Sequence, residues 1–191
     1  MKPALDRSAW FRRFARNVAL WLVPSAVAWL VLTPFYNVFL TKSTENLVRL
    51  TEGPAVTRLQ VKDTHYFVVT RTDLPTSRGF LSSVRVTDTH FPLIMTLAFF
   101  LAVPAVSWRR RLENLGWASL ISIFFHILSL LLWVKFVYVG NPQVRELEAY
   151  SSLQVNGWGL AKHLADLPFK FAMPLLLWSA FYIRQLLPTQ R

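Results

Sequence analysis

The sequence predicts a mainly α-helical membrane protein with four transmembrane helices, both termini in the cytoplasm, and a small β-meander outside the membrane between helices 1 and 2. Three observations support this fold class. Hydrophobic residues make up 53% of the 191-residue chain and form apolar runs of about 20 residues. Basic residues gather on one side of these runs. A β-rich stretch separates the first run from the second.

Four runs are long enough to cross a hydrocarbon core of about 30 Å at about 1.5 Å per residue of helix. We expect the spans at residues 18–40, 91–108, 117–139 and 169–187. The second run carries Pro92 near its start, where proline disturbs a helix least. The first run is too long for a signal peptide and exits through TPFYNVFL, which lacks small residues suited to cleavage. We therefore expect an uncleaved helix.

The distribution of charge predicts the orientation. The net charge is +11, and ten basic residues fall on one side if all four runs span. They are Lys2, Arg7, Arg12, Arg13, Arg16, Arg109, Arg110, Arg111, Arg184 and Arg191. This positive-inside pattern places residues 1–17, 109–116 and 188–191 in the cytoplasm. It indicates contact with anionic membrane lipids rather than with nucleic acid.

Residues 41–90 are the only segment suited to a folded unit outside the membrane, and the predicted orientation places them in the periplasm. Three runs there have strand-like composition: AVTRLQVKD, THYFVVTRT and GFLSSVRVTDT. We expect a three-stranded meander. Because about 50 residues bury little core alone, the unit is expected to lean on the membrane surface, on the second outer loop or on another protein.

The second outer loop, residues 140–168, is predicted to hold two short helices. Asn141 suits a helix N-cap and Pro142 the first helical position, whereas Asn156 and Gly157 would break the first piece. The second piece, GLAKHLADL, places its leucines on one face. This pattern is typical of a helix that lies on the bilayer surface.

A stripe of small and polar residues is predicted on the third span. Its spacings of three, four and three place the members on one helix face: Ser119, Ser122, His126 and Ser129. Such stripes occur where transmembrane helices approach closely and share hydrogen bonds. The partner helix belongs either to this chain or to another protein, and a functional intramembrane histidine is the alternative.

Four other residues are candidates for binding anionic head groups at the outer interface. They are Lys135, Lys162, His163 and Lys170. With the basic outer loop, they would offer a positive surface to an anionic lipid or to a substrate carboxylate. Ordinary anchoring of lysine side chains at the interface explains the same positions.

The sequence gives little sign of catalysis. It has no cysteine, which excludes disulfides, thiolate catalysis and cysteine-based metal sites. Its four histidines lack the spacing of metal ligands, and no glycine-rich phosphate loop or GxSxG nucleophile motif occurs. We therefore expect no catalytic residues, metal or cofactor.

Several stretches resemble a family of bacterial membrane proteins associated with exosortase H. They are RSAWFRRFARN, LTPFYNVFL, the β-rich loop leading into THFPLIMTLAFFLAVP, and SWRRRL. Exosortases are multi-helix membrane transpeptidases that sort secreted proteins, similar in kind to cysteine transpeptidases. The resemblance implies a companion role, because this chain lacks the cysteine that the sortase needs. It offers no catalytic residues to carry over.

The leading hypothesis is a non-enzymatic accessory protein of a bacterial inner membrane that binds an exosortase or its sorted substrate. The alternative is an enzyme or carrier that acts on a lipid-linked anionic substrate at the outer leaflet. Its best residues would be His65, Lys162, His163 and Asp166, with Lys135 and Lys170 holding the anionic head.

Overall fold

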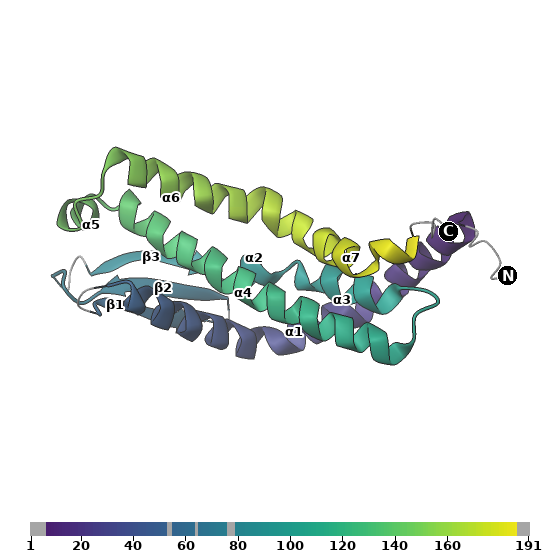
Figure 1. Cartoon of the computed structure of the whole chain (residues 1–191). Helices are drawn as coiled ribbons and strands as arrows, with labels where there is room; N and C mark the ends of the chain where they lie inside the picture. Colours follow the sequence, from purple (N-terminus) through teal and green to yellow (C-terminus); the bar gives the residue numbers. More distant parts are fainter. Residues whose placement is uncertain (1–6, 53–54, 64, 76–78, 187–191) are drawn as a thin grey trace. The chain divides into compact units, whose positions relative to one another are not determined.

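The computed structural model describes residues 7–52, 55–63, 65–75 and 79–186 (Figure 1). The helices are α1 (Arg7–Leu50), α2 (Thr87–His90), α3 (Leu93–Ala102), α4 (Trp108–Gly140), α5 (Pro142–Leu147), α6 (Ser152–Leu164) and α7 (Lys170–Leu186), with the π-helix η1 (Ala165–Phe169) between α6 and α7. The strands are β1 (Thr57–Lys62), β2 (Tyr66–Arg71) and β3 (Phe80–Arg85). A mainly helical chain with a small three-stranded antiparallel sheet is confirmed.

Three helical stretches among the described residues are long and apolar enough to cross a membrane. They are Ser8–Leu50, Trp108–Gly140 and Ser152–Ile183. The predicted span at 91–108 falls in a shorter apolar helical stretch, Thr87–Ala102, to which α3 contributes ten residues, about 15 Å of helix. Val103 leaves the helical conformation with ψ 116°, directly before Pro104. The fourth span and the four-span topology therefore stay predictions.

The polarity of α1 is the reverse of that in a water-soluble protein. Of its seven buried residues between positions 25 and 45, only Leu40 is apolar. The others are Ser25, Thr33, Asn37, Thr41, Thr44 and Glu45. Its exposed side chains over the same region include Val27, Leu30, Val31, Leu32, Phe35, Val38 and Phe39. Such an apolar exterior is stable in lipid rather than in water.

Helix α1 also continues ten residues past the predicted end of the first span. Lys42 and Arg49 both pair with the Glu45 carboxylate, at 3.0 and 2.7 Å, with i,i+3 and i,i+4 spacing. These pairs and the burial of Val48 extend the helix into the segment predicted as the outer loop.

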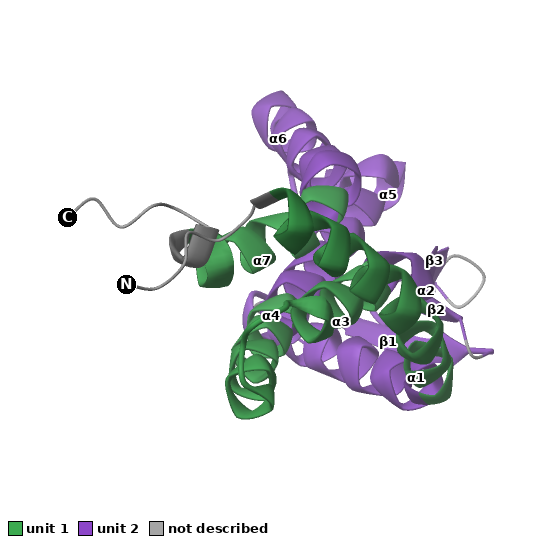
Figure 2. Cartoon of the chain, turned by 90° about the vertical axis from the view of Figure 1, so that its right-hand side faces the viewer, with its two compact units in different colours: residues 1–31, 92–122, 171–191 green, residues 32–91, 123–170 purple. Residues whose placement is uncertain are grey.

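The chain divides into two compact units, which Figure 2 colours separately. Unit 1 comprises residues 1–31, 92–122 and 171–191. Its core brings together α1, α3, α4 and α7 through Trp10, Phe100, Val103, Val106, Ala118, Leu177 and Tyr182. The Arg111 guanidinium donates hydrogen bonds to the carbonyls of Leu101 and Val106, at 2.8 and 3.1 Å. It thereby closes a turn at 103–107. Residues 109–116, expected to link the second and third spans, belong to helix α4.

Unit 2 comprises residues 32–91 and 123–170 and contains the sheet. The strands follow the order β1-β2-β3, with Leu59 opposite Val69 and Phe67 opposite Val84. The buried face of the sheet shares one core with the two long helices and α5. The helical members of this core are Leu40, Val48, Leu130, Val134, Tyr138 and Val144. The support that the sheet was expected to need is therefore supplied largely by helices of its own chain.

The second outer loop folds differently from the prediction. The Asn141 side chain accepts hydrogen bonds from the backbone N–H groups of Gln143 and Val144, as expected of an N-cap. The helical break, however, lies at residues 148–151 rather than at Asn156 and Gly157, which lie inside α6. A capping box between Ser151 and Gln154 starts α6, which then runs through η1 into α7 without interruption.

The predicted orientation can be tested by labelling single introduced cysteines, because the chain has no cysteine of its own. Cysteine placed at Ser83, an exposed position on β3, is expected to react with a membrane-impermeant maleimide in spheroplasts. Cysteine at Glu113, exposed on α4, is expected to react only after the membrane is permeabilised. Equal labelling of both sites in intact spheroplasts would contradict the orientation.

Candidate functional site

Three of the chain's four histidines lie in a polar network in unit 2, which we call the histidine network. His126 of α4 is 4% exposed, and its Nδ1 lies 2.8 Å from the hydroxyl of Tyr36 on α1. The two residues are 90 positions apart in sequence. The contact therefore joins the two long helices of unit 2.

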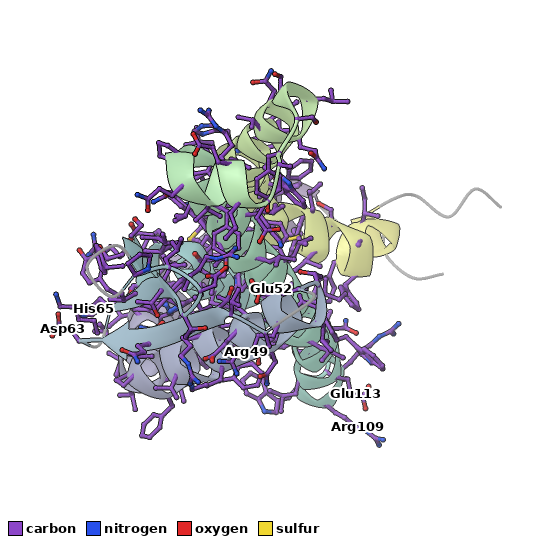
Figure 3. The ribbon with its side chains drawn as sticks, turned by 90° about the vertical axis from the view of Figure 1, so that its left-hand side faces the viewer. Arg49, Glu52, Asp63, His65, Arg109 and Glu113 are labelled. Atoms are coloured by element: carbon purple, nitrogen blue, oxygen red, sulfur yellow. The ribbon has the colours of Figure 1, made fainter. Side chains whose placement is uncertain are left out.

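The second part of the network leads to the exposed β1–β2 turn. His90 Nε2 lies 2.6 Å from Asn37 Oδ1, an acceptor, so Nε2 carries the proton and donates. The Asn37 amide donates to the Thr87 hydroxyl at 3.5 Å, and this hydroxyl lies 3.0 Å from His65 Nδ1. Figure 3 labels His65, whose side chain is exposed. The network thus extends from buried helix faces to a surface turn.

The two parts meet at aromatic rings. The Tyr36 ring centroid lies 5.0 Å from His90 and 5.9 Å from His126 in edge-to-face geometry, and the two imidazole centroids are 6.3 Å apart. Edge-to-face packing of this kind adds to the energy of burial. The network therefore combines hydrogen bonds with ring packing, an arrangement suited to holding helices together inside a membrane.

The serine stripe of α4 is mostly buried within the chain. Ser122, His126 and Ser129 are all buried within the chain, and Ser119 is half-buried. Ser122 donates to the carbonyl of Ala118 at 2.8 Å, whereas the Ser129 hydroxyl has no hydrogen-bond partner among the described residues. The burial of these three residues favours a partner helix within the chain. Binding of another protein by the stripe stays a prediction.

A second polar cluster, the arginine site, is centred on Arg71 of β2, whose side chain is 2% exposed. Its Nε and Nη2 donate to the Asp73 carboxylate at 3.0 and 2.7 Å, and Nη2 lies 2.8 Å from Glu148. The guanidinium also lies 5.0 Å from the centroid of the Tyr138 ring. Arg71 therefore joins the sheet to α4 and to the end of α5.

Glu52 lies beside this site and ties the end of α1 to β1. Its carboxylate accepts hydrogen bonds from the backbone N–H groups of Val56 and Thr57 and from the Tyr138 hydroxyl, each at 3.1 Å. The Thr57 hydroxyl also contacts Glu52 and Tyr138. Arg49, which Figure 3 labels with Glu52, donates to the Thr57 carbonyl at 2.8 Å.

The charges of the arginine site are stabilised by pairing. Burial alone would lower the pKa of Arg71, but hydrogen bonds to Asp73 and Glu148 outweigh it and raise the pKa above its ordinary value. The hydrogen bond from Arg71 lowers the pKa of Asp73 below its ordinary value. Burial raises the pKa of the nearby Tyr150 phenol. Arg71 and Asp73 are therefore both ionised at neutral pH.

The predicted head-group residues are largely engaged within the protein. Lys162 Nζ lies 3.6 Å from the Trp133 ring centroid and 3.4 Å from the Asp166 carboxylate, which also pairs with Lys170 at 2.9 Å. The Lys162 and Lys170 side chains are mostly buried. Asp166 lies four residues from each lysine, a spacing that was readable from the sequence. A head-group role for these two lysines is therefore not favoured.

The other two candidates differ in exposure. Lys135 is half-buried, with Nζ 5.5 Å from the Tyr138 ring centroid. His163 is exposed, and its ring lies 5.7 Å from that of Phe136. Over the described ranges, no group of three or more histidine and carboxylate residues is placed to hold a metal ion.

Long helices with apolar exteriors and hydrogen-bonded polar interiors define an α-helical membrane protein. A family model described as "Exosortase H-associated membrane protein" matches residues 8–185, nearly the whole chain. The chain belongs to this family. Comparisons with curated proteins and with solved structures found no match.

The contact between Tyr36 and His126 is expected to couple the two helices energetically. Tyr36→Phe and His126→Phe should each destabilise the protein. A double-mutant cycle should return a coupling energy of about 0.5–1.7 kcal/mol, because either change alone removes the same hydrogen bond. Unfolding by dodecyl sulfate in mixed micelles measures these free energies. Tyr66→Phe, on the exposed β2 face, serves as the control, and additive effects would contradict the coupling.

The arginine site is expected to make stability depend on pH. Because the pKa of Asp73 is depressed in the folded protein, its contribution is complete above the ordinary carboxyl value of 3.8 and is lost as pH falls through the folded pKa. Asp73→Asn should lower the free energy of unfolding at neutral pH by about 1–3 kcal/mol. It should also reduce the further loss of stability as the pH is lowered. Thermal melts across pH in detergent test this. Asp88→Asn is the control, because Asp88 pairs with Arg85 in an exposed position.

Proposed function

We propose that this protein is a non-enzymatic accessory subunit of an exosortase-type sorting system in a bacterial inner membrane. It binds the sortase or the sorted substrate. The observation that carries the proposal is the family match over residues 8–185, whose description names an association with exosortase H. The chain has no cysteine, so it does not supply a thiolate nucleophile itself.

The arrangement of polar groups supports a binding role. His126, His90 and Arg71 are buried and engaged by neighbouring side chains, and Lys162 is buried against Trp133 and Asp166. Groups held in this way stabilise packing. With both termini in the cytoplasm, the sheet of unit 2 lies in the periplasm, where a sorted protein is processed.

The test is in-membrane crosslinking of the tagged protein in its native host, followed by purification in mild detergent. We expect recovery of the exosortase in a fixed ratio. Deleting the gene for this chain should reduce processing of sorted proteins, and the wild-type chain should restore it. An unrelated multi-span protein of the same membrane, tagged identically, controls for co-solubilised proteins. Recovery of the chain with bound lipid alone, and normal processing after deletion, would overturn the proposal.

A substitution separates this role from an enzyme acting on a lipid-linked substrate. His163→Ala is expected to preserve sorting and abundance, because His163 is exposed and its ring contacts Phe136. Asn156→Ala, also exposed on α6, is the matched control. Sorting would be followed by immunoblot of a substrate in the complemented deletion strain. Loss of sorting by His163→Ala at unchanged abundance would favour the enzyme.

A further inference from the structure

The three-stranded sheet has two outer edges, β1 and β3, with β2 between them (Figure 1). The start of the β1 edge is occupied by side chains from the end of α1 and from the residues that follow it. The Thr57 N–H donates to the Glu52 carboxylate at 3.1 Å, and the Thr57 carbonyl accepts a hydrogen bond from Arg49 at 2.8 Å. Such contacts protect a sheet edge, whose backbone groups could otherwise pair with another chain.

The backbone of the β3 edge points outward. The Val86 N–H donates to the His65 carbonyl at 2.9 Å, which identifies these two residues as a hydrogen-bonded pair. Such pairs alternate along an antiparallel ladder, so the backbone groups of Ser83 and Arg85 point away from β2. Both residues are exposed. Among the described residues, their N–H groups have no partner on this edge, and the Ser83 carbonyl meets only the Ser82 hydroxyl, at 3.4 Å.

The charge of the sheet favours an acidic partner for this edge. None of the three strands contains an acidic residue, and the face opposite the core carries Arg58, Lys62 and Arg85. Of these three, Arg85 alone forms a salt bridge within the described residues, with Asp88 at 3.4 Å. Both side chains of that pair are more than half exposed, so the pair is weak. Carboxylates complement this face, whereas the same edge of a second copy would bring cations together.

The two faces of the sheet define the side chains that a paired strand would carry. Successive side chains of a strand point to opposite faces. On the exposed face they would lie beside Ser83 and Arg85, where a carboxylate meets a cation. On the other face they would lie beside Val84, which belongs to the core, so apolar side chains fit there. A short segment suffices, because the β3 ladder is regular over residues 82–86.

We propose that the β3 edge binds a short extended segment of a partner protein, in which acidic and apolar residues alternate. The segment adds an antiparallel fourth strand to the sheet. Main-chain hydrogen bonds to Ser83 and Arg85 supply affinity, and the alternating side chains supply specificity. This inference goes beyond the proposed function, because it assigns a mode of binding that does not depend on which protein supplies the segment.

A defined peptide tests the pairing. The probe is a fluorescent peptide of about eight residues, with alternating glutamate and valine and blocked ends. Fluorescence anisotropy reports its binding to the purified protein in nanodiscs of zwitterionic lipid. Binding is expected, and a peptide with lysine in place of glutamate should bind about tenfold more weakly or worse. N-methylation of the glutamates, whose N–H groups face β3 in this pairing, should abolish binding although the charge is kept. N-methylation of the valines is the matched control and should have little effect.

Proline substitution tests the same contact from the side of the protein. Ser83→Pro removes the outward N–H and leaves the hydrogen bonds between β2 and β3 in place. It should weaken peptide binding about tenfold or more. Val61→Pro makes the same change on β1, where the Val61 N–H also points outward, and should bind the peptide normally. Thermal melts establish that both variants fold.

Several outcomes would overturn the proposal. They are equal binding of the glutamate and lysine peptides, undiminished binding of the peptide methylated on its glutamates, undiminished binding to folded Ser83→Pro, and no binding to the wild-type protein. If Ser83→Pro does not fold, the methylated peptides decide the question on the wild-type protein.

Discussion

A membrane interior cannot solvate polar side chains, and the structure depends on how α1 meets this constraint. Between residues 25 and 41 its exposed side chains are apolar, and its serine, threonine and asparagine residues lie on the buried face. In unit 2, Asn37 on this face is hydrogen-bonded to Thr87 and His90 of α2, and the neighbouring Tyr36 contacts His126 of α4. The histidine network is thus the point where the buried amide of Asn37 is satisfied. The sheet then packs over the end of the same helix.

Much of this architecture could be predicted from the sequence. The thickness of the bilayer sets the length of the apolar runs, and strands are rich in β-branched and aromatic residues. The three strands and the Asn141 cap fall where expected. The two wrong boundaries follow from side-chain contacts near the ends of helices. Helix α1 extends because Glu45 pairs with Lys42 and Arg49, and the α3–α4 turn comes early because Arg111 satisfies its carbonyls.

The candidate site was predictable only in part. The spacing around His126 indicated a helix contact, but nothing in one sequence identifies Tyr36, 90 residues away, as the partner. His65 and His90 lack any local motif, since the fold alone joins them. Arg71 is one of many basic residues in the sequence, and its burial follows from its place on the inner face of β2. The four-residue spacing of Lys162, Asp166 and Lys170 did predict their ion pairs, but not the burial of Lys162 against Trp133.

The shared core of sheet and helices has a consequence for biosynthesis. Strand β3 ends at Arg85, whereas the α4 residues that complete the core begin at Leu130. At about 5–20 residues per second, the ribosome needs a few seconds to bridge this interval. During that time, the strands have left the ribosome without the surface that buries Phe67 and Val69. The nascent chain therefore passes through a window in which chaperones and proteases meet an unfinished sheet, and slower translation of residues 86–129 lengthens it.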